Sequence, residues 1–140
     1  LTAFFANNQK TYGYSNISMT PLPFTPLLNA VKTKIEAATQ THFSSCLLNL
    51  YRDGQDSNGW HADDEKELGI NPVIASVSLG AERAFHLKHK KIKDLKHKLN
   101  LQNGSLLLMK GETQHQWLHQ IPKTKKPLGK RINLTFRLLK

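Results

Sequence analysis

A histidine and a carboxylate lie two residues apart at His61 and Asp63, and a second carboxylate, Glu65, follows two residues later. In an extended segment, side chains at alternate positions share a face, so we expect these three to point together. Two histidines and one carboxylate on one face form a metal site with open positions, which suits oxygen chemistry on Fe(II). The second histidine must then come from another strand. By itself the spacing is also compatible with a polar surface strand.

A second set of chemically capable side chains lies in the last predicted strand, residues 131–138. Its polar face carries Arg131, Asn133, Thr135 and Arg137. A guanidinium that points inward costs free energy unless it meets an anion, and its planar fork suits a carboxylate. Two of the four arginines of the chain lie on this face, which indicates a bound dicarboxylate. A strand whose polar face meets solvent is the alternative.

The elements that must position these residues form a mainly β domain with an N-terminal helix. Apolar residues recur at helical spacing over residues 26–39, and Pro26 is acceptable at a helix start. After this helix, short apolar runs bounded by Gly, Asn and Asp predict strands. The expected strands cover residues 46–52, 61–63, 73–79, 83–88, 105–110, 115–121 and 131–138. This order is typical of a β-sandwich or barrel, a jelly roll among them.

Positive charge is concentrated in the C-terminal part of the chain. Residues 1–87 contain six basic and eight acidic side chains, whereas residues 88–140 contain fourteen basic and two acidic ones. Six lysines lie within residues 88–98, which we expect to form a solvent-facing hairpin connection or loop. The asymmetry favours a polyanionic partner such as nucleic acid, and a solvated lysine surface is the alternative.

Composition excludes several classes of protein. A chain of 140 residues is the length of one domain, and we expect a single domain over residues 1–140. The apolar runs are far shorter than the ~18 residues of a membrane span, and no secretory signal pattern is recognisable. The single cysteine, Cys46, can form no intrachain disulfide. We therefore expect a reducing intracellular compartment, the cytoplasm or nucleus.

Taken together and in order, these motifs resemble the AlkB family of 2-oxoglutarate- and Fe(II)-dependent dioxygenases. The resemblance covers about residues 12–138 and extends through residues 49–54, 73–81, 104–109 and 132–136. Within the family, the chain most resembles the members that repair alkylated bases in DNA, including the vertebrate duplex-DNA repair enzymes. It implies a double-stranded β-helix, or jelly roll, with the metal between its sheets.

The resemblance also implies a ligand set. The implied iron ligands are His61, Asp63 and His119, because the second histidine of the family lies shortly before a proline and about a dozen residues before the first arginine. His115 is the competing candidate, since it lies on the same face of the predicted strand as His119. For 2-oxoglutarate, the implied binding residues are Asn49, Tyr51, Arg131, Asn133 and Arg137, with Arg131 on the distal carboxylate.

For the substrate, the resemblance implies a base that is flipped out of the duplex and held by stacking and edge contacts. Tyr12 and Tyr14 match the aromatic segment that packs on this base. They fall within a short N-terminal nucleotide-recognition segment of about residues 1–25. Glu65 matches the acidic residue that meets the edge of the base.

A basic loop is expected after the predicted ligand strand. Lys123, Lys125 and Lys126 occupy the place where duplex-acting relatives carry basic residues, although Thr124 interrupts the run. We expect Lys125 and Lys126 to bind substrate at the rim of the cleft. The lysines of residues 88–98 would then form a more remote surface.

The function implied by the resemblance is oxidative demethylation, the direct repair of N-alkylated bases in DNA. The reaction uses Fe(II), 2-oxoglutarate and O2 and releases formaldehyde, succinate and CO2. One alternative is an oxygenase of the same family that acts on RNA or protein, and another is a catalytically silent nucleic-acid-binding module. The intact metal set and both arginines argue against silence. We expect a monomer that binds DNA and does not bind membranes.

Overall fold

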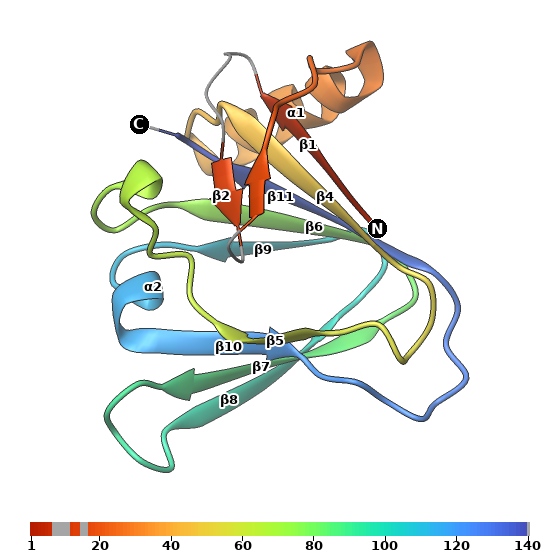
Figure 1. Ribbon diagram of the computed structural model, residues 1–140, viewed down its shortest axis with the longest axis vertical. Helices are drawn as coiled ribbons and strands as arrows, with labels where there is room; N and C mark the ends of the chain where they lie inside the picture. Colours follow the sequence, from red (N-terminus) through yellow and green to blue (C-terminus); the bar gives the residue numbers. More distant parts are fainter. Residues whose placement is uncertain (7–11, 15–16, 140) are drawn as a thin grey trace.

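The computed structural model describes residues 1–6, 12–14 and 17–139, with the side chains of residues 1–6 and 20–139. Two antiparallel sheets are stacked face to face (Figure 1). The larger sheet has five strands, in the spatial order β1 (Thr2–Ala6), β4 (Ser45–Tyr51), β11 (Arg131–Arg137), β6 (Ile74–Gly80) and β9 (Ser105–Met109). The smaller sheet has four, in the order β5 (Asn58–His61), β10 (Trp117–Ile121), β7 (Arg83–His89) and β8 (Lys96–Leu101).

The chain passes repeatedly from one sheet to the other. Strands β4, β5, β6 and β7 alternate between the sheets, and β9, β10 and β11 alternate again after the β7–β8 hairpin. This alternation is the topology of a jelly roll, and the predicted fold class is confirmed. A further hairpin of β2 (Tyr12–Tyr14) and β3 (Ile17–Met19) lies in front of the larger sheet in the view of Figure 1.

The helix α1 (Pro26–Thr39) has the bounds that its apolar spacing predicts. The side chain of Thr25 caps its first turn by accepting a hydrogen bond from the backbone N–H of Leu28 at 3.1 Å. Two short helical turns follow later in the chain, η1 (Lys66–Leu68) and α2 (Thr113–Gln116). None of the helices among the described residues is long and apolar enough to cross a membrane.

Several parts of the secondary structure differ from the prediction. Strand β5 spans Asn58–His61 rather than residues 61–63, and the hairpin of β2 and β3 was not predicted. Strand β1 was not predicted. The expected strand over residues 115–121 begins only at Trp117, because α2 precedes it. The lysine-rich connection is limited to residues 90–95, since Lys96 and Lys98 belong to β8. Strand β8 lies at the edge of its sheet and is exposed up to Leu101, so lysines are compatible with it.

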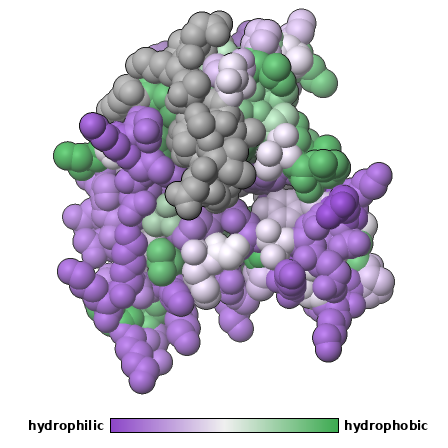
Figure 2. All heavy atoms as spheres, viewed as in Figure 1, coloured by the Kyte–Doolittle hydropathy of each residue, from purple (hydrophilic) through white to green (hydrophobic). Residues whose placement is uncertain are grey.

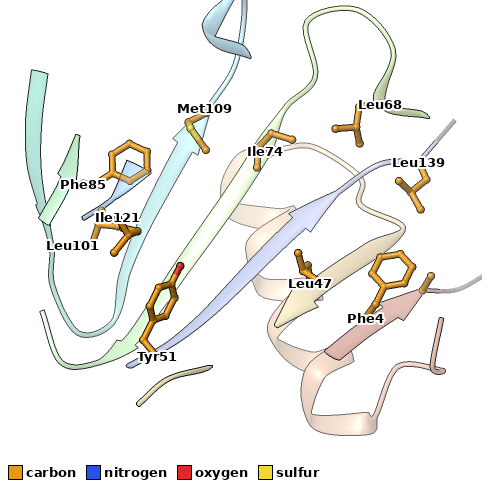
Figure 3. Packing of buried hydrophobic residues seen from close by; sticks show 11 residues of the cluster. Phe4, Leu47, Tyr51, Leu68, Ile74, Phe85, Leu101, Met109, Ile121 and Leu139 are labelled. Atoms are coloured by element: carbon orange, nitrogen blue, oxygen red, sulfur yellow. The ribbon is translucent and has the colours of Figure 1, made fainter. Parts of the chain in front are cut away.

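Two apolar clusters hold the layers together. One lies between the sheets and includes Leu47, Phe85 and Ile121 (Figure 3). The other lies under α1, where Leu134 and Phe136 of β11 are buried. The alternate residues of β11 therefore point to the opposite side, into the space between the sheets. This places a row of polar side chains in the interior of the domain.

Candidate active site

His61 and His119 meet across two paired strands. His61 ends β5 and is directly opposite His119 of β10 in the antiparallel register. Their rings make an edge-to-face contact with centroids 4.2 Å apart. Asp63 follows β5 by two residues, and one candidate ligand atom from each of the three side chains lies within 4.8 Å of the others. The structure thus brings together the three residues that the resemblance implies.

Both histidines are held in a form that can bind a metal ion. His61 Nδ1 lies 2.7 Å from the carbonyl oxygen of Gly59. Because a carbonyl only accepts, Nδ1 is the donor, and Nε2 is the nitrogen left to bind a metal ion, which is the usual arrangement of a metal-binding histidine. The ring of His119 is buried and stacks on Phe85. Burial, together with the neighbouring His61, lowers the pKa of His119 to about 4, so this imidazole is neutral at pH 7.

Asp63 supplies a buried negative charge to the same point. Burial by itself raises the pKa of this carboxyl, but its electrostatic interactions with Arg137 first and then with His119 and His61, together with the hydrogen bond from Arg137, outweigh burial and hold the pKa below its ordinary value. Its Oδ2 accepts a hydrogen bond from Arg137 at 2.9 Å, whereas its buried Oδ1 has no hydrogen-bond partner among the described residues. Two imidazoles and a carboxylate with a buried open oxygen fit Fe(II).

His115 lies outside this group. It belongs to α2, and its Nε2 accepts a hydrogen bond from the backbone N–H of Asn71 at 2.9 Å. The expectation that His115 and His119 share a strand face is therefore wrong, because the chain is helical through Gln116. The structure brings His119, and not His115, to Asp63.

Gln114 is a site residue that the sequence analysis does not identify. Its side chain is fully buried, and its Oε1 accepts a hydrogen bond from the backbone N–H of Asp63 at 2.8 Å. Its backbone carbonyl accepts from Lys90 Nζ at 3.2 Å, and Lys90 also contacts Asp64 at 3.4 Å. No motif marks this residue, because the contact joins segments 51 positions apart in the sequence.

We expect Gln114→Met to lower the free energy of unfolding by ~1–3 kcal/mol, because the substitution keeps the side-chain length but leaves the buried N–H of Asp63 without an acceptor. Urea unfolding of the metal-free protein measures this loss. Gln116→Met in the same short helix is the matched control and should change the stability much less. Equal stability of the two variants would contradict the positioning role of Gln114.

The residues implied for 2-oxoglutarate come together on the larger sheet. In the register of β11, Arg131 is opposite Tyr51 of β4, and Asn133 is opposite Asn49. These four side chains and Arg137 line a single pocket with the metal-binding group. The lining residues are Asn49, Tyr51, Asn58, His61, Asp63, Ser76, Phe85, Leu101, Met109, His119, Ile121, Arg131, Asn133, Thr135 and Arg137.

Arg131 is the buried cation of this pocket. It is 1% exposed, its guanidinium lies 4.9 Å from the ring centre of Tyr51, and one terminal nitrogen donates to Ser78 Oγ at 2.9 Å. Its Nε and other terminal nitrogen are buried without an acceptor among the described residues. Burial lowers the pKa of Arg131, yet an arginine stays charged at any physiological pH. Open donors on a buried guanidinium fit one carboxylate of 2-oxoglutarate.

Two other implied residues have protein partners. Arg137 lines the pocket and also forms an ion pair with Asp63. The amide nitrogen of Asn133 donates to Ser76 Oγ at 2.7 Å, and its amide oxygen accepts from Thr135 at 2.8 Å. These contacts tie the ligand carboxylate and strand β6 to strand β11.

The expected substrate residues lie in several places. Glu65 is half-buried at the start of η1 and is not part of the metal-binding group, although the extended pattern predicts that it shares a face with Asp63. Tyr12 and Tyr14 lie in β2, but their side chains are outside the described part of the chain. Nothing further is assigned to them here.

The two basic segments contact different parts of the domain. Lys125 and Lys126 are exposed in the loop after β10, which packs on the turn at Gly54, where Thr124 N–H donates to the carbonyl of Gly54 at 2.9 Å. That these two lysines bind substrate at the rim of the cleft stays a prediction. Of the lysines in residues 88–98, Lys90 contacts the backbone carbonyl of Gln114 beside the ligand carboxylate, and its own N–H donates to the carbonyl of Gln116 in α2.

Comparison with known proteins agrees with this geometry. Residues 4–137 match the family described as the 2OG-Fe(II) oxygenase superfamily. The chain belongs to this superfamily. Membership implies Fe(II) and 2-oxoglutarate, and the donor set and buried Arg131 fit both. The structure titled "The structure of OsALKBH1" shares the fold, with a TM-score of 0.70 and 20% identity over 98% of this chain and 77% of that one.

Curated relatives confirm the resemblance to the AlkB family. The DNA oxidative demethylase ALKBH2 of Bos taurus is 41% identical over 143 residues, which cover 96% of this chain and 51% of the relative. The alpha-ketoglutarate-dependent dioxygenase alkB homolog 3 of Homo sapiens is 42% identical over 146 residues, which cover 98% of this chain and 50% of the relative. The chain thus spans about half the length of these relatives.

Proposed function

We propose that this domain catalyses the oxidative demethylation of N-alkylated bases in DNA with Fe(II), 2-oxoglutarate and O2. The observation that carries the proposal is one pocket that joins the group of His61, Asp63 and His119 to the buried guanidinium of Arg131. A relative named DNA oxidative demethylase, similar over almost the whole chain, supports the choice of DNA.

The chain contributes binding, orientation and the exclusion of water. His119 and His61 offer imidazole nitrogens, and Asp63 offers a carboxylate that Arg137 holds in one orientation. Arg131, on the larger sheet, would bind the distal carboxylate of 2-oxoglutarate. When bound, Fe(II) would supply the oxidation of the N-methyl carbon by O2, coupled to the decarboxylation of 2-oxoglutarate, with formaldehyde, succinate and CO2 as products.

Glu65 is the residue that we assign to the edge of the base. It follows Asp63 by two residues and precedes η1, so it lies next to the metal-binding group without joining it. A carboxylate in this position accepts a hydrogen bond from an exocyclic amino group of the base.

Glu65→Ala should therefore keep iron binding and the decarboxylation of 2-oxoglutarate without substrate, while losing repair or changing the preferred base. Succinate release without DNA and formaldehyde release with methylated DNA separate the two effects. Glu67→Ala, at an exposed position of η1, is the matched control and should behave as the unsubstituted protein. Loss of iron binding in Glu65→Ala would show that Glu65 is a metal ligand instead.

A substrate panel tests the proposed function itself. Methylated single-stranded DNA, methylated duplex DNA and methylated RNA are incubated with the iron-loaded protein, and mass spectrometry follows the loss of the methyl group. We expect demethylation of DNA. Activity on RNA alone would favour the RNA-acting alternative. Binding of DNA without any succinate release would favour a silent binding module.

A further inference from the structure

The outer face of the four-stranded sheet combines positive charge with an exposed indole. None of the residues in strands β5, β7, β8 and β10 is acidic. The inner face of this sheet carries Phe85, Leu101 and His119, so the alternate positions point outward. The basic side chains at outward positions are His86, Lys88, Lys96 and Lys98. In Figure 2, hydrophilic residues predominate over the lower part of the molecule, where this sheet lies.

Trp60 is the aromatic centre of this face. It is 39% exposed, although burial of an indole is strongly favourable. The Lys88 ammonium lies 4.3 Å from the centre of its ring, in cation–π contact. An exposed indole beside ammonium groups can stack on an unpaired base while the lysines contact phosphates.

Two lysines on this face repel each other across the β7–β8 pair, and a nearby anion would reduce that repulsion. Lys88 of β7 is directly opposite Lys96 of β8, and Lys98 lies two positions along β8 on the same face. Like charges at directly opposite positions destabilise an antiparallel pair. A phosphodiester strand lying over these positions would remove that repulsion.

This face is continuous with the active site around the edge of the sheet. Strand β5 is the edge strand, and Trp60 immediately precedes His61 of the metal-binding group. Lys90, two residues beyond Lys88, contacts Asp64 at 3.4 Å, next to Asp63. A strand that enters the pocket with one nucleotide can therefore pass directly onto the outer face.

We propose that the outer face of the four-stranded sheet, defined here by Trp60, Lys88, Lys96 and Lys98, binds a single-stranded nucleic-acid segment that flanks the nucleotide in the pocket. The single strand is the occupant because stacking on Trp60 needs an unpaired base, whereas bases of a duplex have their faces covered. The path of the strand rests on the proposed function. Binding to the face does not depend on catalysis.

The test measures the affinity of metal-free protein for a short unmodified oligodeoxythymidine by fluorescence anisotropy over a salt series. Lys96→Ala/Lys98→Ala should flatten the slope of log K against log salt by up to ~1.4, at about 0.7 for each phosphate contact on a single strand. Trp60→Ala should weaken binding at least about fivefold with an unchanged slope, because stacking is not electrostatic. Lys34→Ala/Lys110→Ala removes the same charge at exposed positions elsewhere and should leave both quantities unchanged.

Measurements of Tm and of succinate release separate a loss of binding from a loss of folding or of activity. The Lys96→Ala/Lys98→Ala protein should melt at or above the Tm of the unsubstituted protein, since a like-charge pair is lost, and should keep succinate release without substrate. Binding that depends on Lys125 and Lys126 but not on Lys96, Lys98 or Trp60 would overturn the inference. If oligodeoxythymidine binding depends on this face but no demethylation occurs, the proposed function fails and the binding surface stands.

Discussion

His119→Ala should reduce iron-dependent turnover of 2-oxoglutarate to background. The substitution removes one of two imidazole nitrogens that converge with Asp63 within 4.8 Å, and a site left with one histidine and one carboxylate holds Fe(II) poorly. His61→Ala should have the same effect. Succinate release and the iron content of the purified protein measure it.

His115→Ala is the matched control for this experiment. That histidine accepts one hydrogen bond from Asn71 N–H at 2.9 Å and does not reach the group, so we expect most of the activity to remain and a stability loss of about 1 kcal/mol. The carboxylate is better tested as Asp63→Asn than as Asp63→Ala, because the amide oxygen still accepts a hydrogen bond from Arg137, although both variants remove the counter-charge of this buried arginine. Normal iron binding and turnover in the His119 variant would refute the assignment.

Arg131→Lys should raise the apparent KM for 2-oxoglutarate by roughly ten- to a hundredfold. An ammonium cannot make the bidentate contact of a guanidinium, and the loss of a charge-assisted hydrogen bond of ~1.5–3 kcal/mol corresponds to that range. The effect should fall on KM, because Arg131 lies on the larger sheet, across the pocket from the metal-binding group. Initial rates of succinate release over a 2-oxoglutarate series measure it.

Arg83→Lys provides the control with the same chemistry. Arg83 is also buried, and its guanidinium lies 5.4 Å from the ring centre of Tyr51. Its nitrogens, however, donate to the backbone carbonyls of Asp53, Asp56 and Pro122. We expect Arg83→Lys to lower the Tm without a comparable rise in KM. An unchanged KM in Arg131→Lys would show that Arg131 is structural.

Local patterns of the sequence are sufficient for much of this architecture. Helix α1 follows from apolar spacing and Pro26. The separation of polar and apolar residues onto opposite faces of β11 follows from strict alternation, whereas the packing of the apolar face under α1 directs the polar face between the sheets. The pairing of His61 with Asp63 as candidate ligands follows from their spacing and from the resemblance. These are features that a short stretch of chain determines by itself.

Tertiary structure decided the contacts between distant segments. The resemblance already favours His119 over His115, and the physical reason is that α2 ends before Trp117. The acceptor of the Asp63 backbone N–H is Gln114, which α2 supplies. Sheet register also turns Arg137 toward Asp63 while Arg131 keeps open donors. Hydrogen-bond partners and register depend on which strands become neighbours.

The position of the lysines was decided in the same way. Sequence alone makes residues 88–98 a basic run, whether loop or strand. Pairing of β8 with β7 places Lys96 opposite Lys88, and the folded connection brings Lys90 to Asp64 beside the metal-binding group. The sequence determines which residues are charged. The packing of the sheets determines that Lys90 lies close to Asp64, 26 residues away in the chain.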